Sequence, residues 1–249
     1  MVNREIESFK ELWAGGYCEG NPLDPHAKSS YSVQDVLNGY CDQRAPLAPD
    51  GTAIAGETGF LSTLYVTYLM TIRNRVAGKT VLEIGPGRGC WTRAMLHEGA
   101  KFIYALDALS AEHNAFFEHV GEAARGQVKY SVVDDFSCRD VPDGSIDFVF
   151  SFGCFCHLSR ASVAQYMRSI RTKMRSGADG FIMISDYDKR DAVLRVSSNK
   201  EEDQTPSPGR WYHIGIDWFA STAQMLGFEV IDRDIGCNLR DPVVHFRLK

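Results

Sequence analysis

Residues 80–96, TVLEIGPGRGCWTRAML, place a carboxylate directly before a glycine-rich loop. Glycines alternate with other residues at positions 85, 87 and 89, and Glu83 stands two residues before the first of them. Glycine tolerates positive φ and lets the backbone approach a ligand closely. The spacing departs from the G-x-G-x-x-G pattern of dinucleotide loops, because the third glycine comes one residue early. Glu83 would repel a phosphate and attract an ammonium group, so the loop predicts a positively charged ligand part.

Two further sets of acids follow apolar runs downstream of this loop. The run FIYALD ends in Asp107, next to Ala108, and an acid at that place accepts hydrogen bonds from the hydroxyls of a ribose. The next run ends in VVDDF, where Asp134 and Asp135 compete for one contact with an adenine amino group, since adjacent strand residues point to opposite faces. Phe136 would pack near the adenine ring. A cationic amino acid, a ribose and adenine together describe S-adenosylmethionine.

Alternating strand-like and helix-like runs after Gly78 would position these acids. The strand-like runs are continuously apolar, which is typical of a parallel sheet buried on both faces. This alternation predicts a doubly wound α/β sheet whose ligands bind beyond the carboxyl ends of the strands. We expect strands at residues 80–85, 102–107, 128–133, 146–152, 180–185, 228–234 and 243–248, and helices at residues 90–99, 111–125, 160–175 and 217–227.

The N-terminal part of the chain is irregular and rich in turn formers. Only residues 33–41 and 59–78 read as helices, the second of them ending at Gly78. We therefore divide the chain into a cap or lid segment, residues 1–78, and a Rossmann-like domain, residues 79–249. The cap is expected to close over the bound cofactor and over a second substrate, the acceptor. Tyr17 and Tyr31 are the candidate contacts with that acceptor.

In this order and at these intervals, the motifs resemble those of the Rossmann-like (class I) S-adenosylmethionine-dependent methyltransferases. The resemblance covers residues 80–249 and is carried by VLEIGPGRG, Asp107, VVDDF, DGSIDFVFSF and two closing strands. It implies a seven-stranded, mostly parallel sheet whose last strand runs antiparallel beside the fifth, with S-adenosylmethionine as the cofactor. The segments SFGCFCHL, GYCEGNP and RDPVVHF also resemble methyltransferases that act on sugars and glycans.

The resemblance also implies a set of cofactor contacts in the loop, at the strand ends and after the fourth strand. These residues are Glu83, Gly85, Pro86, Gly87, Gly89, Asp107, Ala108, Asp134, Asp135, Phe136, Ser151 and Phe152.

His157 follows the fourth expected strand, where this family often places residues next to the transferred methyl group. A histidine can remove a hydroxyl proton near neutral pH, so His157 is the candidate general base, with a surface or packing histidine as the alternative. Cys154, Cys156 and His157 lie too close in sequence to wrap around one ion, because zinc ligands are more widely spaced. We expect no metal.

Aromatic and polar residues flank the polar stretch at 195–209 and are candidates for acceptor binding, although packing alone would also explain each of them. They are Tyr187, Trp211 and His213. The implied reaction is an in-line methyl transfer from a sulfonium to a nucleophile, in which the protein supplies alignment, desolvation and a proton acceptor. O-methylation of a sugar or another small hydroxylated acceptor is the first hypothesis.

Three alternatives stay open. A neutral amine acceptor needs no base, so the protein could be an N-methyltransferase on a small amine. A nicotinamide-dependent oxidoreductase is disfavoured by the loop spacing and by Glu83. A binding protein that has kept the fold but lost the chemistry would retain the same loop and acids.

Composition narrows the partners and the compartment. The 249-residue chain has a net charge of −5 and an isoelectric point near 5.8, so nucleic acid is not a favoured partner. No apolar run approaches the roughly 20 residues of a membrane span, and the N-terminus does not read as a signal peptide. Seven scattered cysteines without CxxC pairs indicate reduced thiols and a cytoplasmic protein. The oligomeric state is left open.

Overall fold

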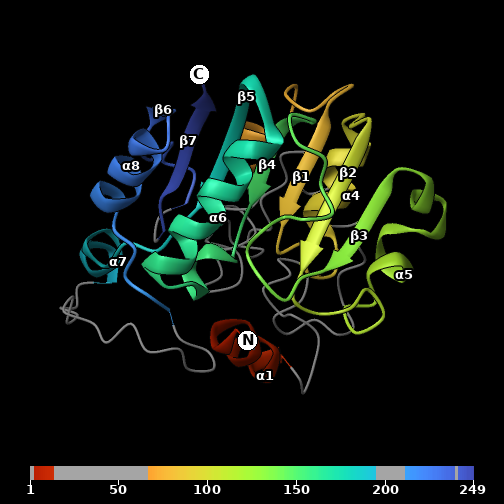
Figure 1. The fold of residues 1–249 in the computed structure, drawn as a ribbon, viewed down its shortest axis with the longest axis horizontal. Coiled ribbons are helices and arrows are strands. Elements are labelled where there is room, and N and C mark those ends of the chain that lie inside the picture. Colours follow the sequence, from red (N-terminus) through yellow and green to blue (C-terminus); the bar gives the residue numbers. More distant parts are fainter. Residues whose placement is uncertain (1–2, 14–66, 195–210, 239–240) are drawn as a thin grey trace, which may run out of the picture.

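The computed structural model describes residues 3–13, 67–194, 211–238 and 241–249, and its centre is a seven-stranded sheet (Figure 1). The strand order is β3-β2-β1-β4-β5-β7-β6. The strands are β1 (Thr80–Ile84), β2 (Phe102–Asp107), β3 (Val128–Val132), β4 (Ile146–Ser151), β5 (Met174–Met183), β6 (Phe228–Asp232) and β7 (Val243–Leu248). The first five strands are parallel, and β7 runs antiparallel to both β5 and β6. The predicted doubly wound sheet with an antiparallel last strand is confirmed.

Helices cover both faces of this sheet, with α6 in front of it in Figure 1. The α-helices are α1 (Arg4–Trp13), α4 (Cys90–His97), α5 (Phe116–Val120), α6 (Arg160–Lys173), α7 (Tyr187–Leu194) and α8 (Ile216–Met225). Two 3-10 turns, η1 (Glu122–Gly126) and η2 (Phe155–His157), are also present, and residues 67–71 are helical. None of the helices in the described residues is long and apolar enough to cross a membrane.

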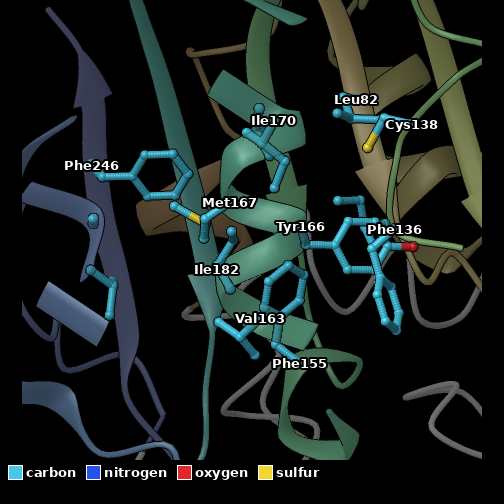
Figure 2. Packing of buried hydrophobic residues seen from close by; sticks show 14 of the residues in the cluster. Leu82, Phe136, Cys138, Phe155, Val163, Tyr166, Met167, Ile170, Ile182 and Phe246 are labelled. Atoms are coloured by element: carbon cyan, nitrogen blue, oxygen red, sulfur yellow. The ribbon is translucent and has the colours of Figure 1, made fainter. Parts of the chain in front are cut away.

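Each face of the sheet has its own buried apolar cluster. On one face α4, α5 and residues 67–78 pack on β1 and β2, so Ile72 and Val76 are fully buried beside Val81. On the other face α6 and α8 pack on β4 and β5. Figure 2 shows Met167 of α6 next to Ile182 of β5. The division of the chain into a cap, residues 1–78, and a Rossmann-like domain, residues 79–249, stays a prediction.

Two expected helices are wrong in their extent. Residues 111–115 form turns that end at Ala115 (φ 46°), just before α5, and Gly121 (φ 103°) separates α5 from η1. Both residues adopt the left-handed or extended positive-φ region that interrupts a helix. The expected helix 59–78 is helical at residues 67–71 and then turns, with Asn74 at φ 61°. Residues 33–41 lie outside the described part of the chain.

A third correction concerns the junction between α6 and β5. The helix ends at Lys173, so Met174, which the apolar spacing placed on the helix, is the first residue of β5. Met174 is nevertheless buried in the same cluster as Ile170. The strand therefore begins six residues before Gly180, where the sequence predicted it to start.

Candidate active site

The carboxyl ends of β1, β2, β3 and β4 meet at one edge of the sheet, and α1 lies beneath that edge in Figure 1. The glycine loop follows β1 there. A Cβ on Gly85 would lie 2.6 Å from the Cβ of Cys154, and one on Gly89 would lie 2.3 Å from Cγ2 of Val120. Neither position can accept a side chain without displacing its neighbour. Gly89 is thus required by the packing of α4 on α5, a reason independent of any ligand.

Asp107 ends β2 with its carboxylate 4% exposed. Its Oδ1 accepts the N–H of Leu109 at 2.9 Å, and its Oδ2 accepts the N–H of Gly87 at 3.1 Å. Burial raises the pKa of Asp107 to about 6, although these backbone N–H groups act in the opposite direction. The carboxylate therefore ties the glycine loop to the end of β2, and it also accepts hydrogen bonds from the Asn114 side chain and the Ala108 N–H.

Glu83 lies on β1 with its carboxyl group 1% exposed. The Thr92 hydroxyl donates to its Oε2 at 2.5 Å, whereas its Oε1 has no hydrogen-bond partner among the described residues. Burial is the main cause that raises the pKa of Glu83 to about 8, and the hydrogen bond from Thr92 lowers it. A buried acceptor without a donor is costly, so this oxygen is suited to a donor from outside the chain.

A pocket opens at the same edge and encloses about 380 Å³ of empty space, its open mouth included. Its lining is mainly apolar and comes from α1, the ends of β1 and β2, the segment after β3, the loop after β4 and α6. The lining residues are Ile6, Phe9, Ile84, Gly85, Leu106, Asp107, Ala108, Val133, Phe136, Cys154, Leu158 and Tyr166. Four predicted cofactor residues, Gly85, Asp107, Ala108 and Phe136, therefore share one pocket. Glu83 precedes the lining residue Ile84 on β1 but does not line the pocket itself.

The residues after β3 separate into exposed and buried ones. Asp134 forms an ion pair with Arg139, and its side chain is 70% exposed. Asp135 accepts the N–H and the hydroxyl of Ser137 at 2.9 and 2.6 Å, with its side chain 46% exposed. Phe136 is buried, and Figure 2 shows its ring beside that of Tyr166, with ring centroids 4.8 Å apart. Only Phe136 of this predicted group reaches the pocket.

The segment after β4 holds the candidate base. Ser151 is buried and donates its hydroxyl to the Ile84 carbonyl at 2.8 Å, and Phe152 is buried against Trp91. His157 is half-buried, and its ring packs edge-on against Phe9 and Trp211, with centroids 6.1 and 5.2 Å away. His157 does not itself line the pocket, but Phe9, which contacts its ring, and Leu158, the next residue, both do. Within the described residues no group of His, Cys, Asp and Glu is placed to hold a metal ion.

The candidate acceptor residues after β5 are joined to one another. The Tyr187 N–H donates to Nδ1 of His213 at 3.0 Å, and the Tyr187 hydroxyl donates to the Trp211 carbonyl. Tyr187 and His213 are both buried, whereas Trp211 is half-buried against His157. Of these three side chains, Trp211 contacts the ring of the candidate base.

Asp186 holds the starts of two helices in this region. Its Oδ1 accepts the N–H groups of Asp188 and Lys189 at 2.8 and 3.2 Å, in the first turn of α7. Its Oδ2 accepts the N–H of Ile216 at 2.8 Å, where α8 begins. A carboxylate at a helix N-terminus satisfies donors that have no partner within the helix. The acid at position 186 is therefore explained by capping.

Several site residues were not found by sequence reasoning. Ile6 and Phe9 reach the pocket from α1, and Leu158 and Tyr166 reach it from the segment after β4 and from α6. No helix is expected from the sequence at residues 4–13, so the side chains of Ile6 and Phe9 could not be placed. Tyr17 and Tyr31 lie outside the described residues.

Comparison with known proteins agrees with this geometry. Residues 60–232 match the model of a methyltransferase domain family. A comparison with curated proteins finds no significant match. Three solved structures share the fold at low sequence identity. An S-adenosylmethionine-dependent methyltransferase from Mesorhizobium loti is 13% identical, with a TM-score of 0.58 over 74% of this chain and 97% of that one.

The other two similar structures come from different bacteria. A methyltransferase from Aquifex aeolicus is 18% identical, with a TM-score of 0.51 over 75% of this chain and 89% of that one. An O-methyltransferase family protein from Burkholderia thailandensis is 15% identical, with a TM-score of 0.59 over 78% and 57% of the two chains.

The fold and the site define an enzyme of the Rossmann-like methyltransferase class. The family model covers more than half of the chain, so the chain belongs to the methyltransferase domain family. The class predicted from the sequence, an S-adenosylmethionine-dependent methyltransferase, is confirmed, and the nicotinamide-dependent alternative falls away.

Proposed function

We propose that this enzyme methylates a hydroxyl group of a small acceptor, with a sugar as the first candidate. The observation that carries the proposal is the position of His157. Its half-buried ring follows β4, next to the pocket, and is held between Phe9 and Trp211. A histidine in that place can accept the proton that a hydroxyl group loses as it is methylated.

The residues present fit S-adenosylmethionine. Asp107 would accept the ribose hydroxyls, and Ala108 and Phe136 provide apolar surface for the adenine. Gly85 brings the backbone to the pocket wall beside Cys154, and the unpartnered Oε1 of Glu83 is the buried acceptor that an ammonium group would satisfy. The contacts of Asp134, Asp135, Gly87, Gly89, Pro86, Ser151 and Phe152 with the cofactor stay predictions.

When bound, the cofactor supplies an electrophilic methyl group, so the chain itself has three tasks. The mainly apolar pocket lining excludes water from the reacting atoms. Trp211 and Phe9 fix the plane of the His157 ring and border the space beside it. The unprotonated ring nitrogen of His157 then takes the acceptor's proton, and the resulting imidazolium loses one proton to solvent after methyl transfer.

Replacement of His157 tests this proposal. His157→Ala should lower turnover on a hydroxyl acceptor by on the order of a hundredfold, because a general base contributes about that much. The affinity for S-adenosylhomocysteine should stay within about twofold, since its contacts come from other residues. His157→Gln keeps a hydrogen-bonding group without a useful base, so it separates proton removal from positioning. His97→Ala, at an exposed histidine in the last turn of α4, is the matched control.

The acceptor is identified by mass spectrometry of sugars, phenols and amines incubated with the enzyme and S-adenosylmethionine. Methylated hydroxyl groups support the proposal. Methylation of amines alone, with full activity in both His157 variants, would replace it with the N-methyltransferase alternative.

A further inference from the structure

The carboxylate of Glu5 docks α1 onto the first turn of α6. Glu5 is buried, and its Oε1 accepts the N–H of Ser159, the N-cap residue of α6. Its Oε2 accepts the hydroxyl of Ser159 at 3.0 Å and also that of Ser162. Three donors, 154 and 157 residues further along the chain, therefore converge on this one side chain.

This contact has a clear physical basis. The first N–H groups of a helix have no partner within it, and the positive end of the helix dipole attracts a carboxylate. Hydrogen bonds that involve an ionised group are the stronger ones. Removal of the Glu5 carboxylate would leave buried donors on α6 unsatisfied, which is costly. The interaction is thus strong enough to decide where α1 lies.

Docking of α1 completes one wall of the pocket. Ile6 follows Glu5 directly, Phe9 lies one turn further on, and both side chains line the pocket together with Asp107 and Phe136. Phe9 also packs against the ring of His157. A helix of ten residues is marginal by itself in water, so α1 depends on such contacts.

We propose that Glu5 is a positioning residue of this methyltransferase: its carboxylate holds α1 over the cofactor pocket and so couples cofactor binding to the docking of α1. The inference rests on the proposed cofactor site. Because coupling between two equilibria is reciprocal, cofactor binding must favour α1 docking by the same factor by which docking favours binding.

Calorimetry and hydrogen exchange test this coupling. Glu5→Ala should weaken binding of S-adenosylhomocysteine about tenfold, within the range usual for coupled sites. Ser162→Ala removes one of the three donors and should weaken binding in the same direction but less. In the unmodified enzyme, S-adenosylhomocysteine should slow amide exchange in residues 6–13, and this protection should shrink in Glu5→Ala.

Glu7→Gln is the matched control. Glu7 is on the same helix, but its carboxylate pairs with Lys10 near the solvent at 3.0 Å, so the variant should bind like the unmodified enzyme. A urea titration of each variant sets conditions in which all of them are folded.

The outcomes separate the two proposals. If the unmodified enzyme fails to bind S-adenosylhomocysteine, the cofactor site is wrong and the coupling falls with it. If the enzyme binds but folded Glu5→Ala binds equally well, the cofactor site stands and the role of Glu5 is overturned. A lower urea midpoint with unchanged affinity likewise reduces Glu5 to a structural contact and overturns the inference.

Discussion

Strands β2 and β3 are neighbours in the sheet, and acidic residues lie at or after the end of each. These acids differ in their burial and in their partners. At the end of β2, Asp107 is buried, and backbone N–H groups hold both of its oxygens. After β3, Asp134 and Asp135 extend into solvent and interact with Arg139 and Ser137. The pocket includes Asp107 and excludes the other two.

The difference teaches that strand-end position alone does not make an acid a ligand contact. A buried carboxylate costs free energy unless it is satisfied, so its presence at Asp107 indicates a specific task. A solvated carboxylate costs little, and its capping or ion-pair partners explain it. We therefore expect the effects of substitution to differ sharply between the two regions.

Asp107→Ala should have the largest effect, a loss of at least about a hundredfold in affinity for S-adenosylhomocysteine. The substitution removes the acceptor of the ribose hydroxyls and leaves the N–H groups of Gly87 and Leu109 without a partner, at about 1–3 kcal/mol each. Titration calorimetry measures the affinity. Asp107→Asn keeps one acceptor oxygen, so its affinity should lie between those of Asp107→Ala and the unmodified enzyme. Unchanged affinity in both variants would remove Asp107 from the site.

Glu83→Gln should have an intermediate effect that depends on pH. Burial raises the pKa of Glu83 from 4.5 to about 8, so between these values the folded protein holds more protons than the unfolded chain. The stability of the ligand-free enzyme should therefore fall as pH rises through this window, and the fall should be weaker in Glu83→Gln. Urea unfolding at pH 5 to 8 measures both proteins.

Binding provides the complementary measurement for Glu83. A cationic ligand group favours the ionised carboxylate, so the affinity for S-adenosylhomocysteine should rise from pH 6 to 8 in the unmodified enzyme. Stability and affinity curves that run parallel in Glu83→Gln and the unmodified enzyme would show that Glu83 neither titrates in this range nor contacts the ammonium group.

Asp134→Asn and Asp135→Asn should have the smallest effects, a change of less than about threefold in affinity, as is usual for exposed charges. The same calorimetric titration applies. A tenfold loss in either variant would mean that this acid turns toward the adenine when the cofactor binds, and the contrast between β2 and β3 would then hold only for the ligand-free enzyme.

Much of the sheet could be predicted because strands that are buried on both faces are continuous apolar runs. The runs at 102–107 and 243–248 coincide with β2 and β7. The helix at 111–125 was overestimated, since nothing in the sequence marks Ala115 as a residue with positive φ. Tertiary contacts decide such positions, and local propensity does not record them.

The candidate site was predictable to the extent that it follows strand ends. Asp107 and Gly85 lie in the pocket because the topology brings the ends of β1 and β2 together. Glu5 and Phe9 could not be found, because their partners Ser159 and His157 are about 150 residues away along the chain. No pattern within a window of sequence contains that pairing.

The double capping by Asp186 joins two helices that lie far apart along the chain. Its carboxylate accepts N–H groups from the first turn of α7 and from the start of α8, 30 residues beyond Asp186. A single substitution at position 186 therefore leaves donors unsatisfied at two helix starts at once, so this position tolerates change less well than an ordinary helix cap.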